Sequence, residues 1–353
     1  MTDSIALLLS GGVDSAVALH ILIEQGLHPD CFYINIGPEE DAQWDCTSEE
    51  DIEMARAVAK RYGCRVDIVD CHKEYWDEVT RYTMEKVRAG FTPNPDVMCN
   101  RLIKFGAFNT KVGHDYDLIA TGHYAQTEII DGTKWLTTSV DPVKDQTDFL
   151  AQIYEEQLRK AIFPIGGYMK EEVRAIAERE HLINARRKDS QGICFLGKVN
   201  YNDYVRRYLG ENPGDVVDSD TGKKIGTHKG LWFHTIGQRH GLGFGGGPWF
   251  AVRKDIATNT LYVSHGYAPE DAYRQTFTIA DFHALSGQVP VGNMTFKIRH
   301  TPEFHHGTIQ DAGNGRMTVH ADEPIHGVAP GQFCVIYDED HHRCFGSAEI
   351  DMS

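Results

Sequence analysis

The stretch Ile5-Ala6-Leu7-Leu8-Leu9-Ser10-Gly11-Gly12-Val13-Asp14-Ser15 decides the fold of this chain. Its apolar first half has the length of a buried strand, and the amphipathic sequence that follows, as far as Gly26, predicts a helix. A glycine turn between a strand and a helix leaves the first helical N–H groups unpaired at the positive end of the helix dipole. Gly11 and Gly12 let a ligand approach the backbone, and Ser10 and Ser15 add hydroxyl donors. The stretch therefore predicts a phosphate-binding loop.

This loop differs from the common nucleoside triphosphatase loop, because it lacks the lysine of the G-x-x-x-x-G-K-[ST] pattern. The hexapeptide SGGVDS at 10–15 instead resembles the pyrophosphate-binding loop of enzymes that split ATP into AMP and pyrophosphate. The alternative is an ordinary glycine turn that caps a core helix.

Strand and helix patterns alternate up to about residue 180, which predicts an α/β domain with a doubly wound parallel sheet. Strands are expected at 31–35, 65–69 and 118–121, and helices at 48–62, 75–87, 148–161 and 170–179. Ligands of such sheets bind at the carboxyl ends of the strands. The Ser10 turn and Gly122 each follow a strand, so we expect them on one rim of the sheet.

Short alternating runs separated by Gly and Pro replace this pattern after about residue 205 and predict β structure. Strand-like runs at 295–298, 317–320 and 333–337 are typical of a small barrel. We therefore expect three domains, with boundaries near 205 and 278. They are an N-terminal domain at 1–204, a small β-rich central domain at 205–277 and a C-terminal β-barrel at 278–353.

The formal net charge of −16 argues against nonspecific affinity for nucleic acid, which needs Lys and Arg to displace counterions. The charge is uneven, however, because residues 299–353 hold nine acidic side chains, three Arg and no Lys, while basic residues gather in the middle of the chain. These basic residues are Arg186-Arg187-Lys188, Lys198, Arg206-Arg207 and Lys223-Lys224. They predict a local basic surface, and the alternative is a set of solvated charges.

The N-terminus lacks the features of a signal peptide, and no apolar run approaches the length that spans a membrane. We expect a cytoplasmic protein without a membrane partner. The eight cysteines contain no C-x-x-C pair, which argues against a disulfide framework and a zinc ribbon. The adjacent pairs His305-His306 and His341-His342 point to opposite faces of a strand, so we expect solvated surface and no metal site.

Two cysteines stand in motifs of their own. Asp96 precedes Cys99 by three residues, behind Pro93 and Pro95, so one helical turn would bring both side chains to one face. A carboxylate raises a thiol pKa, and Asp96 therefore suits proton transfer or the binding of a substrate N–H. By itself, Cys99 fits a structural cysteine at the start of a helix.

Cys194 follows the basic run Arg186-Arg187-Lys188 in a predicted loop. An electropositive setting of this kind lowers a thiol pKa, which fits a nucleophile or a sulfur carrier.

Together these motifs resemble those of the tRNA-specific 2-thiouridylases, which thiolate the wobble uridine of certain tRNAs. The resemblance covers nearly the whole chain, and the order and spacing of its strings are specific. The strings are SGGVDS (10–15), TPNPDVMCN (92–100), ATGHY (120–124), KDQ (144–146), KDSQGICF (188–195), HTIGQRHGLG (234–243), PWFAVRKD (248–255) and PGQ (330–332).

The resemblance implies a PP-loop ATP pyrophosphatase domain, then a central tRNA-binding domain and a barrel. It implies that Cys99 is the nucleophile and that Cys194 carries a persulfide, with Asp96 as the candidate acid or base. Implied contacts to the target base are Asn94, Pro95 and Asp96. Implied contacts to tRNA are His123, Lys144, Asp145, Gln146, Arg299, His300 and Gln332. Implied ATP-binding positions are Leu8, Leu9, Ser10, Gly11, Gly12, Val13, Asp14, Ser15, Ile34 and Gly122.

Some of these positions have open alternatives. His300 stands where Tyr is often found and Ile34 where Met is common, so both assignments depart from the family pattern. His123, taken alone, fits a histidine that is satisfied at the end of a strand.

The implied reaction uses ATP, Mg²⁺, tRNA and a persulfide donor, either a cysteine desulfurase or a relay protein. The uridine 2-oxygen is adenylylated, and persulfide sulfur then replaces AMP, directly or as sulfide released when Cys99 and Cys194 form a disulfide. One alternative is an ATP-pyrophosphatase-type synthetase or ligase for a small metabolite, which needs neither Cys99 nor Cys194. Another is a sulfur carrier or tRNA-binding module without turnover, against which the intact loop, Asp96 and both cysteines argue.

Overall fold

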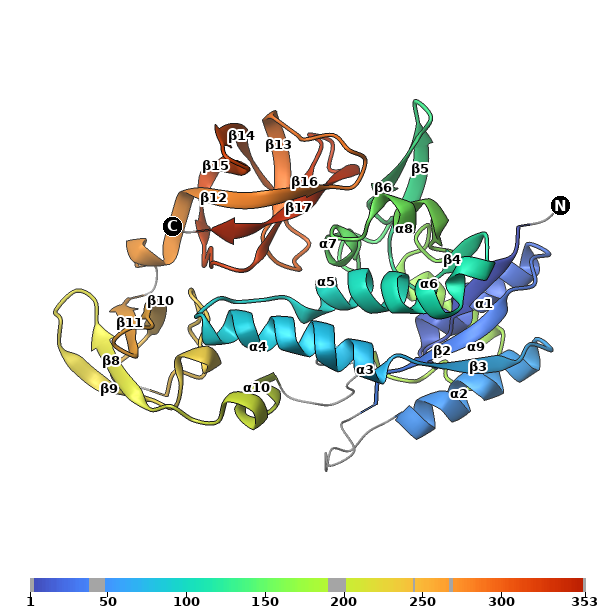
Figure 1. Cartoon of the computed structure of the whole chain (residues 1–353), viewed down its shortest axis with the longest axis horizontal. Helices are drawn as coiled ribbons and strands as arrows, with labels where there is room; N and C mark the ends of the chain where they lie inside the picture. The colour runs from blue at the N-terminus through green and yellow to red at the C-terminus, as the bar shows by residue number, and fades with distance from the viewer. Residues whose placement is uncertain (1–2, 38–47, 190–200, 244, 267–268, 352–353) are drawn as a thin grey trace.

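A five-stranded parallel sheet forms the N-terminal part of the computed structural model, which describes residues 3–37, 48–189, 201–243, 245–266 and 269–351 (Figure 1). The strand order is β3-β2-β1-β4-β7, and every neighbouring pair is parallel. The strands are β1 (Ile5–Leu8), β2 (Asp30–Asn35), β3 (Val66–Asp70), β4 (Leu118–Ala120) and β7 (Ala161–Ile162). All four residues of β1 are buried, as expected for a central strand that is covered on both faces.

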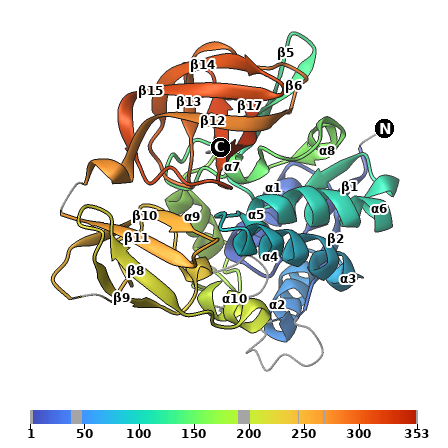
Figure 2. The ribbon, with the colours of Figure 1, turned by 60° about the vertical axis from the view of Figure 1, so that its left-hand side comes forward.

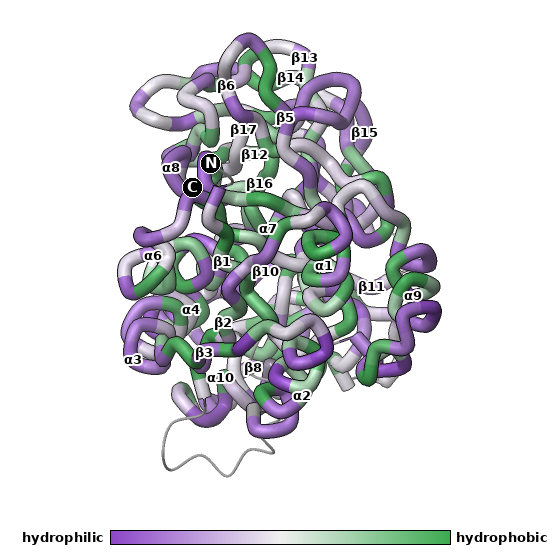
Figure 3. Tube along the Cα trace, turned by 90° about the vertical axis from the view of Figure 1, so that its right-hand side faces the viewer, coloured by the Kyte–Doolittle hydropathy of each residue, from purple (hydrophilic) through white to green (hydrophobic). Residues whose placement is uncertain are grey.

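Helices cover both faces of this sheet, which confirms the predicted doubly wound architecture. One face packs against α1 (Val13–Glu24), α2 (Ser48–Arg61) and α9 (Lys170–Arg179), whose apolar side chains form one buried cluster. The tube of α9 alternates between hydrophobic and hydrophilic residues, as an amphipathic surface helix does (Figure 3).

Two long helical segments run side by side on the other face (Figure 1). The first comprises α3 (His72–Glu74), η1 (Tyr75–Thr80) and α4 (Arg81–Arg88), and the second α5 (Pro95–Cys99), η2 (Asn100–Ala107) and α6 (Phe108–Lys111). In both segments the middle stretch is π-helical. The first begins three residues before the predicted helix at 75–87.

The predicted helix at 148–161 is wrong as a single element. The chain forms α7 (Thr147–Leu150) and α8 (Glu155–Lys160), separated by a turn. Gln157 explains the break, because its side-chain oxygen accepts the Tyr154 N–H at 2.8 Å and so starts a new helix.

The rest of the chain forms two antiparallel-rich β units (Figure 2). After α10 (Tyr201–Leu209), a four-stranded sheet has the order β10-β11-β8-β9. Its strands are β8 (Gly214–Asp218), β9 (Lys224–His228), β10 (Trp249–Asp255) and β11 (Thr260–His265). Six further strands close into a barrel, because β12 pairs with both β15 and β17. They are β12 (Tyr273–Ala284), β13 (Gly292–Lys297), β14 (His305–Gly313), β15 (Arg316–His326), β16 (Phe333–Tyr337) and β17 (Arg343–Asp351).

An unpredicted hairpin from the N-terminal part joins the barrel sheet. It comprises β5 (Gln126–Ile130) and β6 (Thr133–Thr137), and β6 pairs antiparallel with β17. Main-chain hydrogen bonds therefore connect the first and last parts of the chain.

The loop between α4 and α5 is where all three parts meet. The Gly90 carbonyl accepts the Lys254 ammonium from β10 at 3.2 Å, and the Thr92 N–H donates to the Pro330 carbonyl beside the barrel at 2.8 Å. The barrel and the central sheet thus hold both ends of the segment that leads into Asn94. No helix among the described residues has the length and apolarity needed to cross a membrane.

Candidate active site

The predicted phosphate loop forms the junction between β1 and α1. Gly12 is the helix N-cap with extended backbone, and the Ser15 hydroxyl accepts the Ser10 N–H at 3.2 Å. Gly11 has φ +78°, and a Cβ built there would lie 2.5 Å from the Asp51 carbonyl oxygen. Only glycine fits this position, so the loop depends on its glycine both for backbone conformation and for space.

Gly122 follows β4 and lies against the same loop. A Cβ on Gly122 would be 2.7 Å from the Ser15 nitrogen. This close approach confirms that the Ser10 turn and Gly122 share one rim of the sheet.

Three side chains far along the chain contact the loop, and one of them, Arg187, was expected on the basic surface instead. The Asn184 amide donates to the carbonyls of Gly11 and Gly12, both at 3.0 Å. Arg187 donates to the Gly11 carbonyl at 3.3 Å and forms an ion pair with Asp51. Lys170 forms an ion pair with Asp14 at 2.7 Å. More than 150 positions separate each of them from the loop, so no local pattern shows that they contact it.

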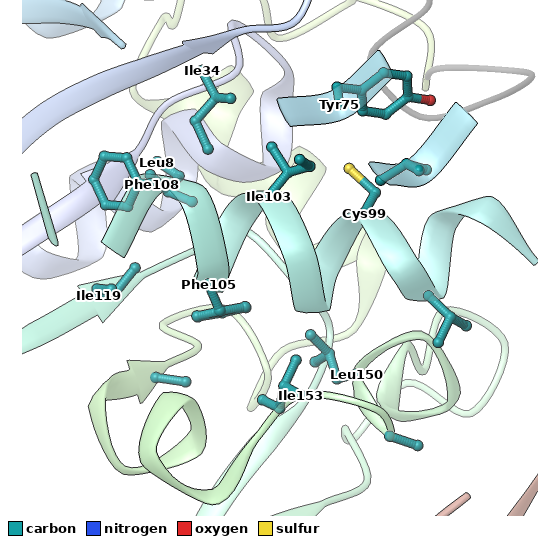
Figure 4. Close-up of a cluster of buried hydrophobic side chains, with 14 of the residues drawn as sticks. Leu8, Ile34, Tyr75, Cys99, Ile103, Phe105, Phe108, Ile119, Leu150 and Ile153 are labelled. Atoms are coloured by element: carbon teal, nitrogen blue, oxygen red, sulfur yellow. The ribbon is translucent and has the colours of Figure 1, made fainter. Parts of the chain in front are cut away.

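The apolar positions implied for ATP binding are buried in the sheet. Leu8 and Ile34 belong to the same hydrophobic cluster as Cys99 (Figure 4). Leu9 lies in the cluster on the other face. The structure places all three side chains in the hydrophobic core of the sheet.

Asn94, Asp96 and Cys99 lie on the first turn and a half of one helix. The Asn94 side-chain oxygen caps α5 by accepting the N–H groups of Asp96 and Val97 at 3.1 and 3.3 Å, and Pro95 occupies the first helical position. Asp96 is half-buried, whereas Cys99 is only 2% exposed and lies close to Tyr75 (Figure 4). Both residues lie within one short helix as predicted, but Asp96 lines a pocket whereas the Cys99 thiol lies inside the apolar cluster.

A pocket of about 480 Å³ adjoins this helix. It brings together six of the residues implied to contact the base or tRNA, which are Asn94, Pro95, Asp96, Arg299, His300 and Gln332. Sequence reasoning missed three further polar lining residues, Asp148, Tyr201 and Lys297, whereas Thr92, which also lines the pocket, belongs to the TPNPDVMCN string. The volume is in the range of small-molecule sites and accommodates a nucleobase.

Carboxylates and carbonyls orient the basic side chains of this pocket. The His300 Nδ1 lies 3.1 Å from Asp148 Oδ2, and its ring packs on Phe149 with a centroid distance of 4.5 Å. The Arg299 guanidinium donates to the carbonyls of Gly327 and Ile236, and burial lowers its pKa. Arg299 thereby connects the barrel to the central part of the chain.

The three residues of the KDQ string all have partners within the protein. Lys144 pairs with Asp189 at 3.0 Å, with both side chains about one-third exposed. Asp145 is buried against Lys297 of the barrel at 3.2 Å, so its carboxylate is not accessible to RNA in this structure. Burial raises the pKa of Asp145, and the charge of Lys297 opposes that shift.

His123 is buried between Lys104 and the third KDQ residue, Gln146. Its Nε2 lies 3.1 Å from the Lys104 ammonium, and its Nδ1 lies 3.0 Å from the Gln146 side-chain oxygen. Burial, with the Lys104 charge second, holds the pKa of His123 well below its usual value. The imidazole is therefore neutral, with Nδ1–H donating to Gln146, and the arrangement fits the satisfied histidine that was the alternative for this position.

The remaining predicted residues are Cys194, the basic residues in the middle of the chain and the paired histidines. Cys194 and Lys198 fall in 190–200, outside the described residues. In the basic middle of the chain, Arg206 pairs with Asp203 and Glu211, whereas Arg186 and Lys188 are exposed. His341 is not simply solvated surface, because its ring stacks on Phe304 at 4.5 Å.

Comparison with known proteins follows the same three-part division. The family models that match are the tRNA methyl transferase HUP domain over residues 3–198, the tRNA methyl transferase PRC-barrel domain over 202–265 and the aminomethyltransferase beta-barrel domain over 274–350. The tRNA-specific 2-thiouridylase MnmA 2 of Bacteroides fragilis is 58% identical over 351 residues, which cover 98% of this chain and 99% of that protein. MnmA of Parabacteroides distasonis is 57% identical over 353 residues, with 98% of each chain covered. With such identity over nearly its full length, this chain belongs to the family of tRNA-specific 2-thiouridylases.

Proposed function

We propose that this chain catalyses the ATP-dependent 2-thiolation of the wobble uridine of tRNA. The observation that carries the proposal is the pocket in which Asn94, Pro95 and Asp96 face Arg299, His300 and Gln332. A base lifted out of the anticodon loop fits such a pocket, with the flanking RNA held by basic side chains. The names of the relatives support the same substrate.

In the proposed first step, the uridine 2-oxygen attacks the α-phosphate of ATP and pyrophosphate leaves into the Ser10–Ser15 loop. The N–H groups at the start of α1 are suited to hold the phosphate oxygens. Asp96 accepts or donates the proton at the base, because it lines the pocket directly. Mg²⁺ would neutralise phosphate charge, and Asp14 is the carboxylate at the loop that fits it, since Mg²⁺ in such sites takes one or two carboxylates together with phosphate oxygens.

In the proposed second step, the terminal persulfide sulfur of Cys194 replaces AMP at carbon 2 of the base. In the direct route the outer sulfur bonds to carbon 2, and Cys99 then attacks the Cys194 Sγ, which breaks the S–S bond, forms a Cys99–Cys194 disulfide and leaves the sulfur on the base. In the other route Cys99 attacks the inner sulfur first, forms the same disulfide and releases sulfide that attacks carbon 2. Both routes require the Cys99 thiol to leave its buried position. We also propose that a cysteine desulfurase or a relay protein loads the persulfide on Cys194, and that the reaction takes place in the cytoplasm.

The test combines the full-length protein with labelled ATP, tRNA and either a persulfide donor or free sulfide. We expect thiolated tRNA, AMP and pyrophosphate in equal amounts with the parent chain. Cys194→Ser should lose persulfide-dependent thiolation and keep pyrophosphate release. Full persulfide-dependent thiolation by Cys194→Ser would contradict the role of Cys194. ATP cleavage that needs a small amine or acid in place of tRNA would support the ligase alternative.

A further inference from the structure

The phosphate loop contains a carboxylate but no cation of its own. Asp14 is the second residue of α1, and the other side chains of Ser10–Ser15 are uncharged. The triphosphate of ATP would bind against the same helix start. Two negative groups at such short range repel each other strongly at a partly buried site.

Lys170, at the start of α9 on the same face of the sheet as α1, supplies a positive charge at this point. Its ammonium lies 2.7 Å from Asp14 Oδ1 and 2.9 Å from Asp14 Oδ2, and its side chain is only 13% exposed. The Tyr124 hydroxyl donates to the same Asp14 Oδ1 at 2.9 Å. The carboxylate is therefore fixed by two donors.

The backbone also holds Lys170 in place. It is the first residue of α9, and its N–H donates to the buried Asp141 carboxylate at 2.8 Å. Helices α9 and α1 belong to one apolar cluster. The position of the ammonium relative to the loop is thus set by packing as well as by charge.

A second carboxylate touches Lys170 but has other cations. Asp189 lies 2.9 Å from the Lys170 ammonium, and it also pairs with Lys144 and Arg174. Burial by itself would raise the pKa of Asp189, but hydrogen bonds from Lys170 and Lys144 outweigh it and bring the pKa to about 2. Asp189 thus has two cations besides Lys170, whereas Lys170 is the cation paired with Asp14 within the described part of the chain.

We propose that Lys170 is the positioning residue that stands in for the lysine missing from the phosphate loop. It neutralises and orients Asp14, so that the triphosphate can bind beside this carboxylate. The inference rests on the proposed use of ATP by this chain.

The test measures equilibrium binding of ATP, and of inorganic pyrophosphate, to the full-length protein without divalent cations, so that Mg²⁺ on Asp14 cannot replace the charge that Lys170 supplies. Lys170→Met should weaken both about tenfold, because Asp14 then faces the phosphates without a cation. Asp14→Asn added to Lys170→Met should restore binding to within about threefold of the parent, although pyrophosphate release from ATP in the presence of Mg²⁺ stays lost, because the carboxylate proposed to hold Mg²⁺ is gone. Parental affinity in Lys170→Met, or a double variant that binds no better than Lys170→Met, would overturn the proposal.

Matched variants separate this role from a general loss of charge or fold. Lys73→Met removes an exposed lysine that pairs with Asp77, and it should leave ATP affinity unchanged. If Asp189→Asn rather than Asp14→Asn rescues Lys170→Met, the proposal is wrong. If Lys170→Met does not unfold cooperatively on heating, ATP binding is measured with Lys170→Arg instead. This variant keeps the positive charge, so a tenfold loss of its ATP affinity would overturn the proposal. A parent that binds ATP without thiolating tRNA would overturn the proposed function and leave these binding ratios intact.

Discussion

The phosphate loop is formed by six consecutive residues, whereas the pocket beside Asp96 takes its opposite wall from Gln332, 236 positions further along the chain. Local backbone rules shape the loop: a strand ends, glycine turns the chain and a helix begins. The pocket exists only because the barrel docks on the loop between α4 and α5. Changes within the loop should therefore affect ATP chemistry alone, and changes at the docking contacts should affect the pocket and the stability of the whole chain.

The largest effect is expected at the loop itself. Asp14→Ala removes the carboxylate proposed to hold Mg²⁺, and Ser15→Ala removes a hydroxyl of the loop, so either change should lower the rate of tRNA-dependent pyrophosphate release by about 10³-fold. Affinity for tRNA should stay within about twofold of the parent, because the pocket does not include the loop. Rapid-quench assays and filter binding measure the two quantities. Parallel losses in both would show that the loop and the pocket are one site.

The docking of the barrel provides the second prediction. Lys297→Met leaves Asp145 buried without its cation, which should lower the free energy of unfolding by about 3 kcal/mol, the lower end for a broken buried pair. Adding Asp145→Leu should recover most of this loss, because no buried charge then remains. Denaturant unfolding of the two variants and the parent measures the difference. Equal stability of the single and double variants would mean that the pair does not connect the two domains.

The dependence of stability on acid pH tests whether His123 is buried in its neutral form. The folded chain holds His123 neutral, because burial and then the Lys104 charge lower its pKa well below 6.5, whereas the unfolded chain binds the proton near 6.5. The unfolded state thus binds more protons below that pH, and stability is lost as the pH falls. His123→Gln should flatten the slope of unfolding free energy against pH by up to about 1.4 kcal/mol per pH unit. The exposed His342→Gln is the control, and equal slopes in His123→Gln and the parent would contradict the buried neutral state.

The smallest effect is expected at the basic surface. Each phosphate contact contributes about 0.7 to 0.9 to the slope of log affinity against log salt, so Arg186→Ala with Lys188→Ala should flatten that slope for tRNA by about 1.5. Arg187 is excluded from this variant, because it donates to the Gly11 carbonyl of the phosphate loop and its removal would disturb ATP binding as well. Titrations over a range of salt concentrations provide the slope. An unchanged slope would mean that Arg186 and Lys188 are solvated and do not contact tRNA phosphates.

The loop could be predicted from the sequence because it is local, whereas features that depend on distant residues could not. The string from Ile5 to Ser15 specified its own strand, turn and helix, because periodicity and glycine conformation are local properties. The hairpin at β5 and β6 was not predicted, because its pairing partner β17 lies about 200 positions away. The break between α7 and α8 was missed because a single side-chain cap at Gln157 outweighed the helical pattern.

The sequence by itself determined the parallel sheet, the phosphate loop, the one-turn spacing of Asp96 and Cys99 and the order of the family motifs. All of these follow from neighbours within one strand or one helical turn. Only the tertiary structure decided that Asp145 is buried against Lys297, that Lys170 forms an ion pair with Asp14 and that Arg299, His300 and Gln332 line one pocket with Asp96. The physical reason is that burial and ion pairing depend on which distant surfaces come into contact, and those contacts form only when the three parts of the chain dock.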